Sequence, residues 1–475
     1  MNSSSQKPEG KLFLGLALLA MLAWTMGDCA KAQTFAVLHT FGPTGVNGAY
    51  PDPTLLLSGN VLYGVAGGGL HGEGTVFSMN INGTGFTNLY DFSGGADGGL
   101  PNAGLILSGN VLYGTATSAG ASGGGTLYRI NTDGSAFTNL HNFTFSDGTG
   151  PRGELLLLGD TLYGTTQAGG VDYANAGTVF AINVGGTGYT KLHVFGGGND
   201  GCDSYSGLIA SGDVLYGTAS GCGAGGWGVV FTMNTNGAGF SVPHSFPGAH
   251  NEPQTEGIEP CDRLVLANNT LYGTTYQGGN AGKGLVFSLT TDGTTYTKLH
   301  DFTAPDTAVN PPTNTDGALP SAGLLLIGDT LYGTSIHGGA SGYGTLFSIK
   351  TNGTGFTNLH SFTINDGAYP YSRLVLGSNN TLYGTTHIAG NGGYGTIFSL
   401  SLATVTLPKL TIALTGTNIV LAWPTNAPGF TLQFTTNLAA PAVWSTNTSV
   451  PAIFNGYYTV TDSISGIQKF YRLIQ

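Results

Sequence analysis

Residues 103–143 read AGLILSGNVLYGTATSAGASGGGTLYRINTDGSAFTNLHNF, and four short apolar runs alternate there with glycine-rich turns. We predict one β-strand for each run, at 103–110, 111–115, 125–130 and 137–143. Gly109-Asn110 and Asp133-Gly134 suit tight hairpins, because glycine and asparagine accept the positive φ that such turns require. Four antiparallel strands joined in this way are typical of one blade of a β-propeller.

The same unit recurs along most of the chain. Leu-Tyr-Gly marks the second strand of each copy and begins at Leu62, Leu112, Leu162, Leu215, Leu271, Leu331 and Leu382. The steps between these positions are 50, 50, 53, 56, 60 and 51 residues. A period near 50 residues, built from short strands, indicates a propeller. The last copy has its third strand at Gly395 but no fourth, and the missing strand stands at the N-terminus as 35–41 (FAVLHTF). We therefore predict an all-β fold, with a seven-bladed β-propeller over 33–403 that its N-terminal strand closes, leaving no open sheet edge.

The N-terminus has the composition of a secretory signal. A weakly basic start precedes the apolar run 12–24, which is short for a transmembrane helix, and the small-residue site Ala30-Lys31-Ala32. We predict a signal peptide over 1–32, no transmembrane segment, and a secreted or cell-surface protein. Cys29 leaves a lipoprotein anchor as the alternative, although Asp28 before it fits such a site badly.

The C-terminal segment differs from the repeats in being rich in Thr and Asn. After a linker at 404–409, its short alternating runs predict a small β-sandwich-like domain over 410–475. Trp423 and Trp444 are the candidates for its core. Whether this domain serves sorting, anchoring or adhesion stays open.

Composition excludes several classes of protein. Glycine is abundant, at 81 of 475 residues, but follows no G-X-Y period, so the chain is not a collagen. The net charge is −11 and no basic stripe occurs, which argues against nucleic acid as a partner. The chain contains no GxSxG, HExxH, P-loop or CxxC motif, and we expect a monomer without a catalytic signature of these kinds.

Three cysteines follow the predicted signal peptide: Cys202, Cys222 and Cys261. Cys202 precedes the fourth blade, and Cys222 lies in the loop after that blade's second strand. Both connections emerge on one face of a propeller, so we predict a Cys202–Cys222 disulfide, which needs Cα atoms within about 7 Å. The alternatives are a Cys222–Cys261 bridge and three free thiols.

Two polar positions recur once per copy. Histidine occupies the fourth strand at His39, His141, His193, His244, His300 and His360, with Tyr90 in the remaining copy. One such residue per blade, on the outer strand, predicts structural hydrogen bonds rather than a metal site. An acidic residue precedes glycine at Asp97, Asp147, Asp200, Glu256, Asp316 and Asp366, with Asn47 in the first copy. We interpret this as turn chemistry, with calcium as the alternative and no other cofactor expected.

The loops between the second and third strands vary among copies, and variable loops are where binding residues are often found. Trp227, Tyr343 and Tyr394 stand directly before the glycine that opens the third strand. Tyr276, His337 and His387 belong to the same loops. Rings of this kind can stack on sugars or on a partner's side chains. The alternative is that they only cover the glycine-rich loops.

The repeat resembles a known family. LYGTTQAGG at 162–170, GTVF at 177–180 and FTNLHNF at 137–143 are similar to the GloVer-type tandem repeats of secreted bacterial proteins. The double glycine is also similar to kelch propellers, but the paired Tyr and Trp of kelch blades do not recur here. The ending Phe470-Tyr471-Arg472-Leu473 resembles terminal domains of exported bacterial proteins. These resemblances imply export and an extracellular role, and they identify no catalytic residues.

We therefore expect a secreted binding or scaffold module for an extracellular carbohydrate or protein. One alternative is a propeller enzyme that acts on extracellular polysaccharide, and another is a purely structural surface protein. Carboxylates that converge on one mouth of the central channel would favour the enzyme. A shallow aromatic face would favour the binding module.

Overall fold

The computed structural model describes residues 33–43, 47–51, 54–170, 175–248, 255–402, 409–425, 430–437, 443–447, 449–463 and 469–474. The described chain forms two compact units, one of residues 33–402 and one that begins at 409. The predicted signal peptide and residues 404–408 of the predicted linker lie outside the described residues. Within the described ranges every regular element but one is a strand, and no helix there has the length and apolar character needed to cross a membrane.

The larger unit is a propeller-like array of four-stranded antiparallel sheets. Residues 103–143 form one of them, in the order β6 (Ile106–Ser108), β7 (Val111–Ala116), β8 (Thr126–Asn131) and β9 (Thr138–Asn142). Its first strand is shorter than predicted, because only three residues pair with β7. The Gly109-Asn110 hairpin has a positive φ at Gly109, as the tight turn requires.

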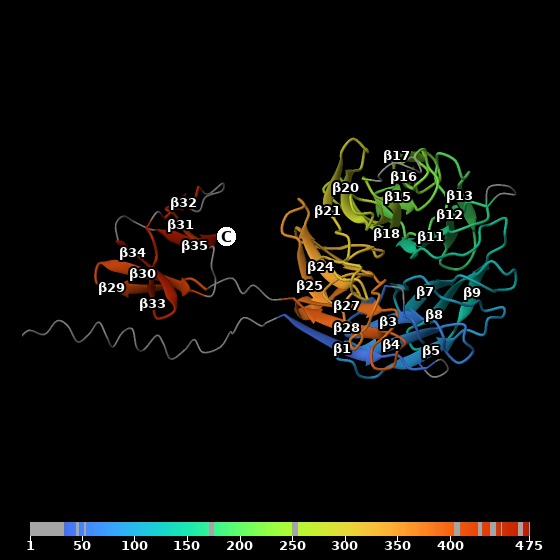
Figure 1. Cartoon of the computed structure of the whole chain (residues 1–475), viewed down its shortest axis with the longest axis horizontal. Coiled ribbons are helices and arrows are strands. Elements are labelled where there is room, and N and C mark those ends of the chain that lie inside the picture. The colour runs from blue at the N-terminus through green and yellow to red at the C-terminus, as the bar shows by residue number, and fades with distance from the viewer. Residues whose placement is uncertain are drawn as a thin grey trace, which may run out of the picture. The chain divides into compact units, whose positions relative to one another are not determined.

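Five further sheets repeat this order. Their strands are β2 (Leu56–Ser58), β3 (Val61–Ala66), β4 (Thr75–Asn80), β5 (Thr87–Asp91), β10 (Leu156–Leu158), β11 (Thr161–Thr166), β12 (Thr178–Asn183), β13 (Thr190–Val194), β14 (Ile209–Ser211), β15 (Val214–Ala219), β16 (Val229–Asn234), β17 (Ser241–Ser245), β18 (Ile258–Ala267), β19 (Thr270–Gln277), β20 (Leu285–Thr290), β21 (Tyr296–Asp301), β22 (Leu325–Ile327), β23 (Thr330–Ser335), β24 (Thr345–Lys350) and β25 (Thr357–Ser361). Successive sheets follow one another around the unit (Figure 1). Each of these sequence repeats therefore forms one four-stranded sheet with the same strand order.

The remaining sheet of this unit combines the two ends of the repeat region. Its order is β26 (Val375–Gly377), β27 (Thr381–Thr386), β28 (Thr396–Ser401) and β1 (Thr34–Thr40), with a short 3₁₀ turn, Ser378–Asn380, before β27. β1 runs antiparallel to β28, pairing Phe35 with Leu400 and Thr40 with Thr396. Figure 1 shows β1 along β28, whereas β2, the next strand in the sequence, belongs to another sheet. The N-terminal strand thus supplies the fourth strand that the last copy lacks.

Neighbouring sheets bury each other's faces. Val76 and Phe92 of one sheet pack with Leu112 and Tyr128 of the next, and all four side chains are fully buried. Equivalent clusters join the other neighbouring sheets, including one in which Phe41 packs with Phe77. Both faces of a sheet are apolar because each face contacts another sheet rather than water.

The recurring histidines lie at these contacts between sheets. His193 of β13 stacks on Phe240 of the next sheet, with ring centroids 3.6 Å apart, and its Nε2 lies 3.2 Å from Asp200 Oδ2. Six equivalent stacks are His39–Phe86, Tyr90–Phe137, His141–Tyr189, His244–Tyr296, His300–Phe356 and His360–Phe35. The acidic residue of the turn is the hydrogen-bond partner of His193, His300 and His360. The predicted hydrogen bond is therefore found for these three histidines, whereas Nε2 of His39, His141 and His244 is buried without a hydrogen-bond partner among the described residues. Stacking is the contact that all six share, and the sequence pattern did not reveal it.

The smaller unit has two sheets. The first contains β29 (Thr411–Thr415), β30 (Asn418–Pro424), β34 (Tyr457–Ser463) and β33 (Ala452–Phe454), and the second contains β32 (Ser445–Thr446), β31 (Thr431–Thr435) and β35 (Phe470–Ile474). Trp423 is buried among Leu421, Leu432 and Val460. Trp444 is outside this core, and the Arg472 guanidinium carbon lies over its ring, 4.2 Å from the ring centroid. Of the two tryptophans expected in the core, only Trp423 is found there.

Candidate functional site

Two sets of long connections meet at one end of the larger unit. The turn that follows each fourth strand and the loop that follows the next second strand meet there, as in the antiparallel bridge between Gly99 and Ser118. Thr117 N donates a hydrogen bond to Leu100 O at 3.1 Å and fixes the same pairing. We call this end the glycine-rich face. The tight hairpins lie at the opposite end of the strands.

A repeated backbone hydrogen bond joins neighbouring sheets on this face. Leu100 N donates to Glu73 O at 2.6 Å, and Leu100 has a φ of 52°. The equivalent donor–acceptor pairs are Tyr50–Tyr394, Gly150–Gly124, Asp203–Ala176, Glu259–Trp227, Leu319–Lys283 and Tyr369–Tyr343. The residue before the glycine of each third strand therefore varies in side chain, but its carbonyl always accepts a hydrogen bond from the turn of the next sheet.

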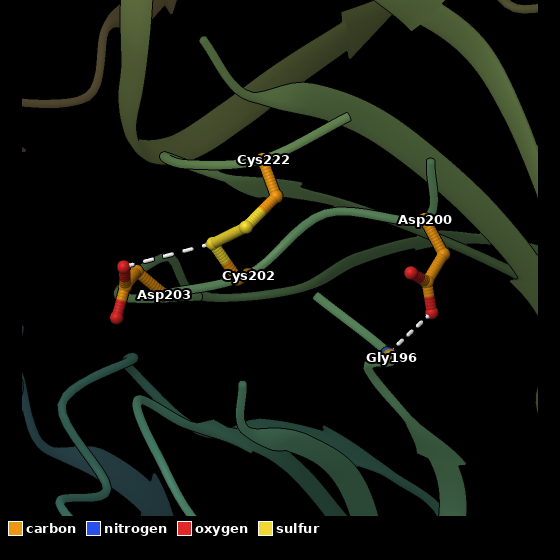
Figure 2. The surroundings of a disulfide bond; sticks show 5 residues. All are labelled: Gly196, Asp200, Cys202, Asp203 and Cys222. Atoms are coloured by element: carbon orange, nitrogen blue, oxygen red, sulfur yellow. Dashed lines mark hydrogen bonds between the residues drawn. A yellow bond between two sulfur atoms is a disulfide. The ribbon is translucent and has the colours of Figure 1, made fainter. Parts of the chain in front are cut away.

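The disulfide lies on this face in the fourth repeat. Cys202 and Cys222 are bonded, with Cα atoms 5.3 Å apart, which is the pairing ranked first from the sequence. Figure 2 shows the bond between the turn that carries Asp200 and the loop after β15. Asp200 accepts a hydrogen bond from Gly196 N at 2.8 Å and so orders the start of that turn. The bridge fixes the segment that presents Asp203.

A cavity of about 510 Å³ lies where the first strands of the sheets begin. Each of the seven sheets of this unit contributes one of the lining residues Thr54, Asn102, Arg152, Tyr205, Cys261, Ser321 and Tyr371. These residues come shortly after the turn on the glycine-rich face, at or just before the first strand of their sheet. We call this space the axial cavity, because segments far apart in sequence converge on it.

Charged groups gather at the axial cavity, although only 8% of the chain is charged. Glu154 Oε2 lies 2.7 Å from an Arg373 nitrogen and 3.5 Å from an Arg263 nitrogen. Asp262 accepts hydrogen bonds from the backbone N–H groups of Arg263 and Gly323, both at 2.7 Å. Burial raises the pKa of Asp262, and the nearby Arg373 charge opposes that rise. Glu154 is thus held by two guanidinium groups and braces three sheets.

A second cavity, of about 380 Å³, shares Tyr205, Cys261 and Tyr276 with the axial cavity and adds Asp203 and Glu259. Burial raises the pKa of Asp203, and Gln277 Nε2 donates to Glu259 Oε2 at 3.2 Å. Burial also raises the pKa of the Cys261 thiol, which opposes formation of a reactive thiolate. We call this space the acidic cavity.

Aromatic rings lead from the rim of this face toward the axial cavity. The Tyr50 ring centroid lies 5.7 Å from that of Tyr394 and 5.2 Å from that of His387. The His387 ring in turn lies 5.4 Å from that of Tyr371, which lines the axial cavity. Tyr50 and Tyr371 are each 37% exposed. We call these four rings the aromatic track.

The residues expected from the sequence are divided among these features. Tyr276 lines the axial and acidic cavities, and Tyr394 and His387 belong to the aromatic track. His337 lines a third cavity, described below. Trp227 and Tyr343 line none of the three cavities: both rings pack against core clusters, and Trp227 Nε1 donates to Gly248 O at 3.1 Å.

Sequence reasoning missed the residues that follow each turn. Asn102, Arg152, Tyr205 and Tyr371 occupy equivalent places in four copies and differ in side chain in each. The turn before them recurs almost unchanged, whereas the residue that follows the turn differs from copy to copy. This contrast is the sequence pattern that could have indicated them. These four residues precede the first strands of their sheets and line the axial cavity, where a ligand can contact them.

The sequence places the chain in a family. Residues 28–220 and 249–426 match the Gloeobacter/Verrucomicrobia repeat. The chain belongs to this repeat family. The resemblance inferred from the LYGTTQAGG, GTVF and FTNLHNF motifs is therefore confirmed. No curated protein matches the chain.

Solved structures resemble this repeat protein only distantly. A GH74 enzyme from Niastella koreensis has a TM-score of 0.48 and 14% identity, over 92% of this chain and 72% of that chain. An oligogalacturonate lyase in complex with manganese has a TM-score of 0.47 and 11% identity, over 78% and 98% of the two chains. TolB from Acinetobacter baumannii has a TM-score of 0.37 and 12% identity, over 72% and 79%. Likenesses at this level support no inference about activity.

Proposed function

We propose that the larger unit is a closed seven-bladed β-propeller that binds an extracellular carbohydrate at its axial cavity. Three contacts between the chain ends support closure. β1 pairs with β28, Phe35 stacks on His360 of β25 with ring centroids 3.7 Å apart, and Tyr50 N donates to Tyr394 O at 2.8 Å. Closure of the ring is what brings a residue from every blade to one site.

The axial cavity and the aromatic track that reaches it carry the proposal. Tyr205, Tyr276 and Tyr371 offer ring faces on which the C–H face of a sugar can stack. Asn102 and Arg152 offer donors for sugar hydroxyl groups beside those rings. A volume of about 510 Å³ suits a ligand of a few sugar rings and falls in the ordinary range of ligand pockets. Aromatic platforms with adjacent polar groups are the chemistry that carbohydrates require.

Export is part of the same proposal. The N-terminal pattern at 1–32 and the Cys202–Cys222 bridge both suit an oxidising compartment, since disulfides persist mainly outside the cytosol. An extracellular protein with an accessible carbohydrate site would meet polysaccharides there. We make no assignment to the smaller unit beyond its being exported with the propeller.

The test uses residues 33–475 in a glycan-array screen, followed by calorimetry with the glycan that binds. Tyr205→Ala and Tyr371→Ala should each weaken binding about tenfold, because a stacked ring contributes on the order of 1 kcal/mol or more. Phe145→Ala is the matched control, since this ring is 49% exposed and lines none of the cavities. Normal affinity in both tyrosine variants would contradict the site, and a screen without any bound glycan would contradict the ligand class.

The acidic cavity favours a second candidate function, hydrolysis of the bound polysaccharide. Asp203 and Glu259 share that cavity with two tyrosines, and burial raises the pKa of Asp203. Glycosidases use a pair of carboxyl groups, one of which acts as an acid when its pKa is raised. Release of reducing ends that is lost in Asp203→Asn and in Glu259→Gln would favour the enzyme. Absence of any release from the glycan that binds would exclude it.

A further inference from the structure

A third cavity, of about 340 Å³, lies on the glycine-rich face beside the axial cavity. It is built by the connection between β21 and β22, in the copy with the longest step to its neighbour. Leu319 and Tyr369 line it, and they stand two residues before Ser321 and Tyr371 of the axial cavity. The two cavities therefore lie close enough along the chain for one extended ligand to enter both.

Hydrogen bonds hold this connection in one conformation. Asp306 and Thr313 pair their backbones, and the Asp306 carboxylate accepts from Ala308 N at 2.9 Å. Asn314 bridges two loops: its Nδ2 donates to Gly317 O at 2.7 Å, and its Oδ1 accepts from Gly317 N and Gly339 N at 2.9 and 2.8 Å. A loop satisfied in this way is already ordered before a ligand arrives, which lowers the entropic cost of binding.

Lys283 is the one charged residue among those that line the third cavity. Lys283 and His337 both line it, and the Lys283 charge adds to burial in lowering the pKa of His337. None of the lining residues, all of which the structure describes, is acidic. No carboxylate among the described residues forms a salt bridge with the Lys283 ammonium group. The Lys283 charge, in a chain of net charge −11, therefore lacks a counter-charge inside this cavity, and His337 with its lowered pKa adds a neutral imidazole beside it.

We propose that the third cavity binds a negatively charged substituent of a carbohydrate, such as a uronic acid carboxylate or a sulfate ester. Lys283 supplies the positive charge, His337 a ring N–H, and Tyr369 a neighbouring polar ring whose centroid lies 4.9 Å from that of His337. Hydrogen bonds in which one partner is charged are the stronger ones, so this contact favours an anionic ligand over a neutral one. The inference rests on the proposed function, because it assigns the charge of the ligand that the axial cavity binds.

The direct test titrates the protein with inorganic sulfate and with glucuronate, at constant ionic strength, and follows histidine side-chain signals by NMR. The His337 signal, assigned from a His337→Gln variant, should shift with saturation for wild type. Lys283→Gln should abolish that shift. Lys350→Gln is the matched control, because it removes one positive charge from the neighbouring β22–β25 sheet, at a residue that pairs with Asp329 2.7 Å away and does not line the cavity. A His337 signal that sulfate and glucuronate leave unchanged, or that shifts equally in Lys283→Gln, overturns the proposal.

The second test compares cellotetraose with its C6-carboxylate and C6-sulfate counterparts, which share one backbone. Wild type should bind at least one charged form about tenfold more tightly than the neutral form. That preference should vanish in Lys283→Gln while the affinity for cellotetraose stays the same. Equal binding of all three forms by wild type overturns the anion preference but leaves the proposed function standing. A sulfate-induced shift of His337 without binding of any glycan, here or on the array, contradicts the proposed function but not the anion site.

Discussion

The glycine that opens each third strand has no room for a side chain. Gly74 has a φ of 103°, and a Cβ added there would lie 2.3 Å from Cδ of Pro101 in the next repeat. The recurring glycine and the recurring proline are thus two halves of one contact between neighbouring sheets. A sequence pattern of this kind reveals that a position is constrained, but it does not reveal that the constraint comes from the neighbouring sheet.

Gly74→Ala should lower the free energy of unfolding by more than about 2 kcal/mol, because it adds a clash to an unfavourable backbone conformation. Gly59→Ala is the matched control: its φ is 58° and nothing lies within 4 Å of its added Cβ. The control should cost only about 1 kcal/mol, the left-handed conformation alone. Urea denaturation of both variants measures the difference, and equal losses would show that the contact with Pro101 is not important.

Buried histidines make stability depend on pH in a defined window. Burial lowers the pKa of His39 and of His244 to about 4. The unfolded chain binds protons near the ordinary pKa of about 6.5, so stability is full above that pH and is lost as pH falls toward 4. The lowered pKa values of Asp97 and Asp316 act in a different window, below about pH 4.

A His39→Phe/His244→Phe variant should therefore lose less stability than wild type between pH 7 and pH 5. Phenylalanine keeps the stack on Phe86 and Tyr296 but cannot bind a proton. The difference should be on the order of 1 kcal/mol per residue, after allowance for partial solvent exposure. His141, His193 and His337 also have lowered pKa values, so some dependence on pH remains. Parallel stability curves for variant and wild type would contradict the assignment.

The strands could be predicted from the sequence in the larger unit, where several copies of the repeat show the same pattern. Strands β7, β8 and β9 lie within one or two residues of the predicted ranges, because hairpin turns and apolar runs agree in every copy. The smaller unit has no repeat to average over, and there the β33–β34 hairpin was not predicted. Its turn, Asn455-Gly456, has positive φ at both residues, and an Asn-Gly pair between two apolar runs is a strong hairpin signal.

β1 is the element on which the last sheet depends. Phe35 stacks on His360 and packs with Phe362 and Phe398, whereas Val37 on the same strand is 38% exposed. Phe35→Ala should lower the free energy of unfolding by about 2–4 kcal/mol, since it removes a large ring packed between two sheets. Val37→Ala should change it by about 0.5 kcal/mol or less. Thermal melts compare the two, and a Phe35→Ala protein as stable as Val37→Ala would mean that β1 does not hold the ends together.

The whole molecule determines the site in a way that no single element does. All seven sheets of the larger unit contribute lining residues to the axial cavity, so residues distant in sequence become neighbours only when the sheets assemble. Tyr276, His387 and Tyr394 are binding candidates from the sequence because aromatic residues stand out in glycine-rich loops, and they lie at or near the axial cavity. The Glu154–Arg263–Arg373 cluster was not predicted, because its three charged residues are far apart in the sequence and form ion pairs only in the assembled sheets.

Hydrogen exchange of residues 33–475, measured by mass spectrometry with and without the bound glycan, tests the central claim most directly. We predict slower exchange in the segments that enter the first strands, 100–105, 150–156, 203–208, 259–264 and 369–374, from several blades at once. The tight hairpins at the opposite end, such as 109–110 and 212–213, should exchange equally in both states. Protection confined to those hairpins or to residues 409–474 would contradict a carbohydrate site at the axial cavity.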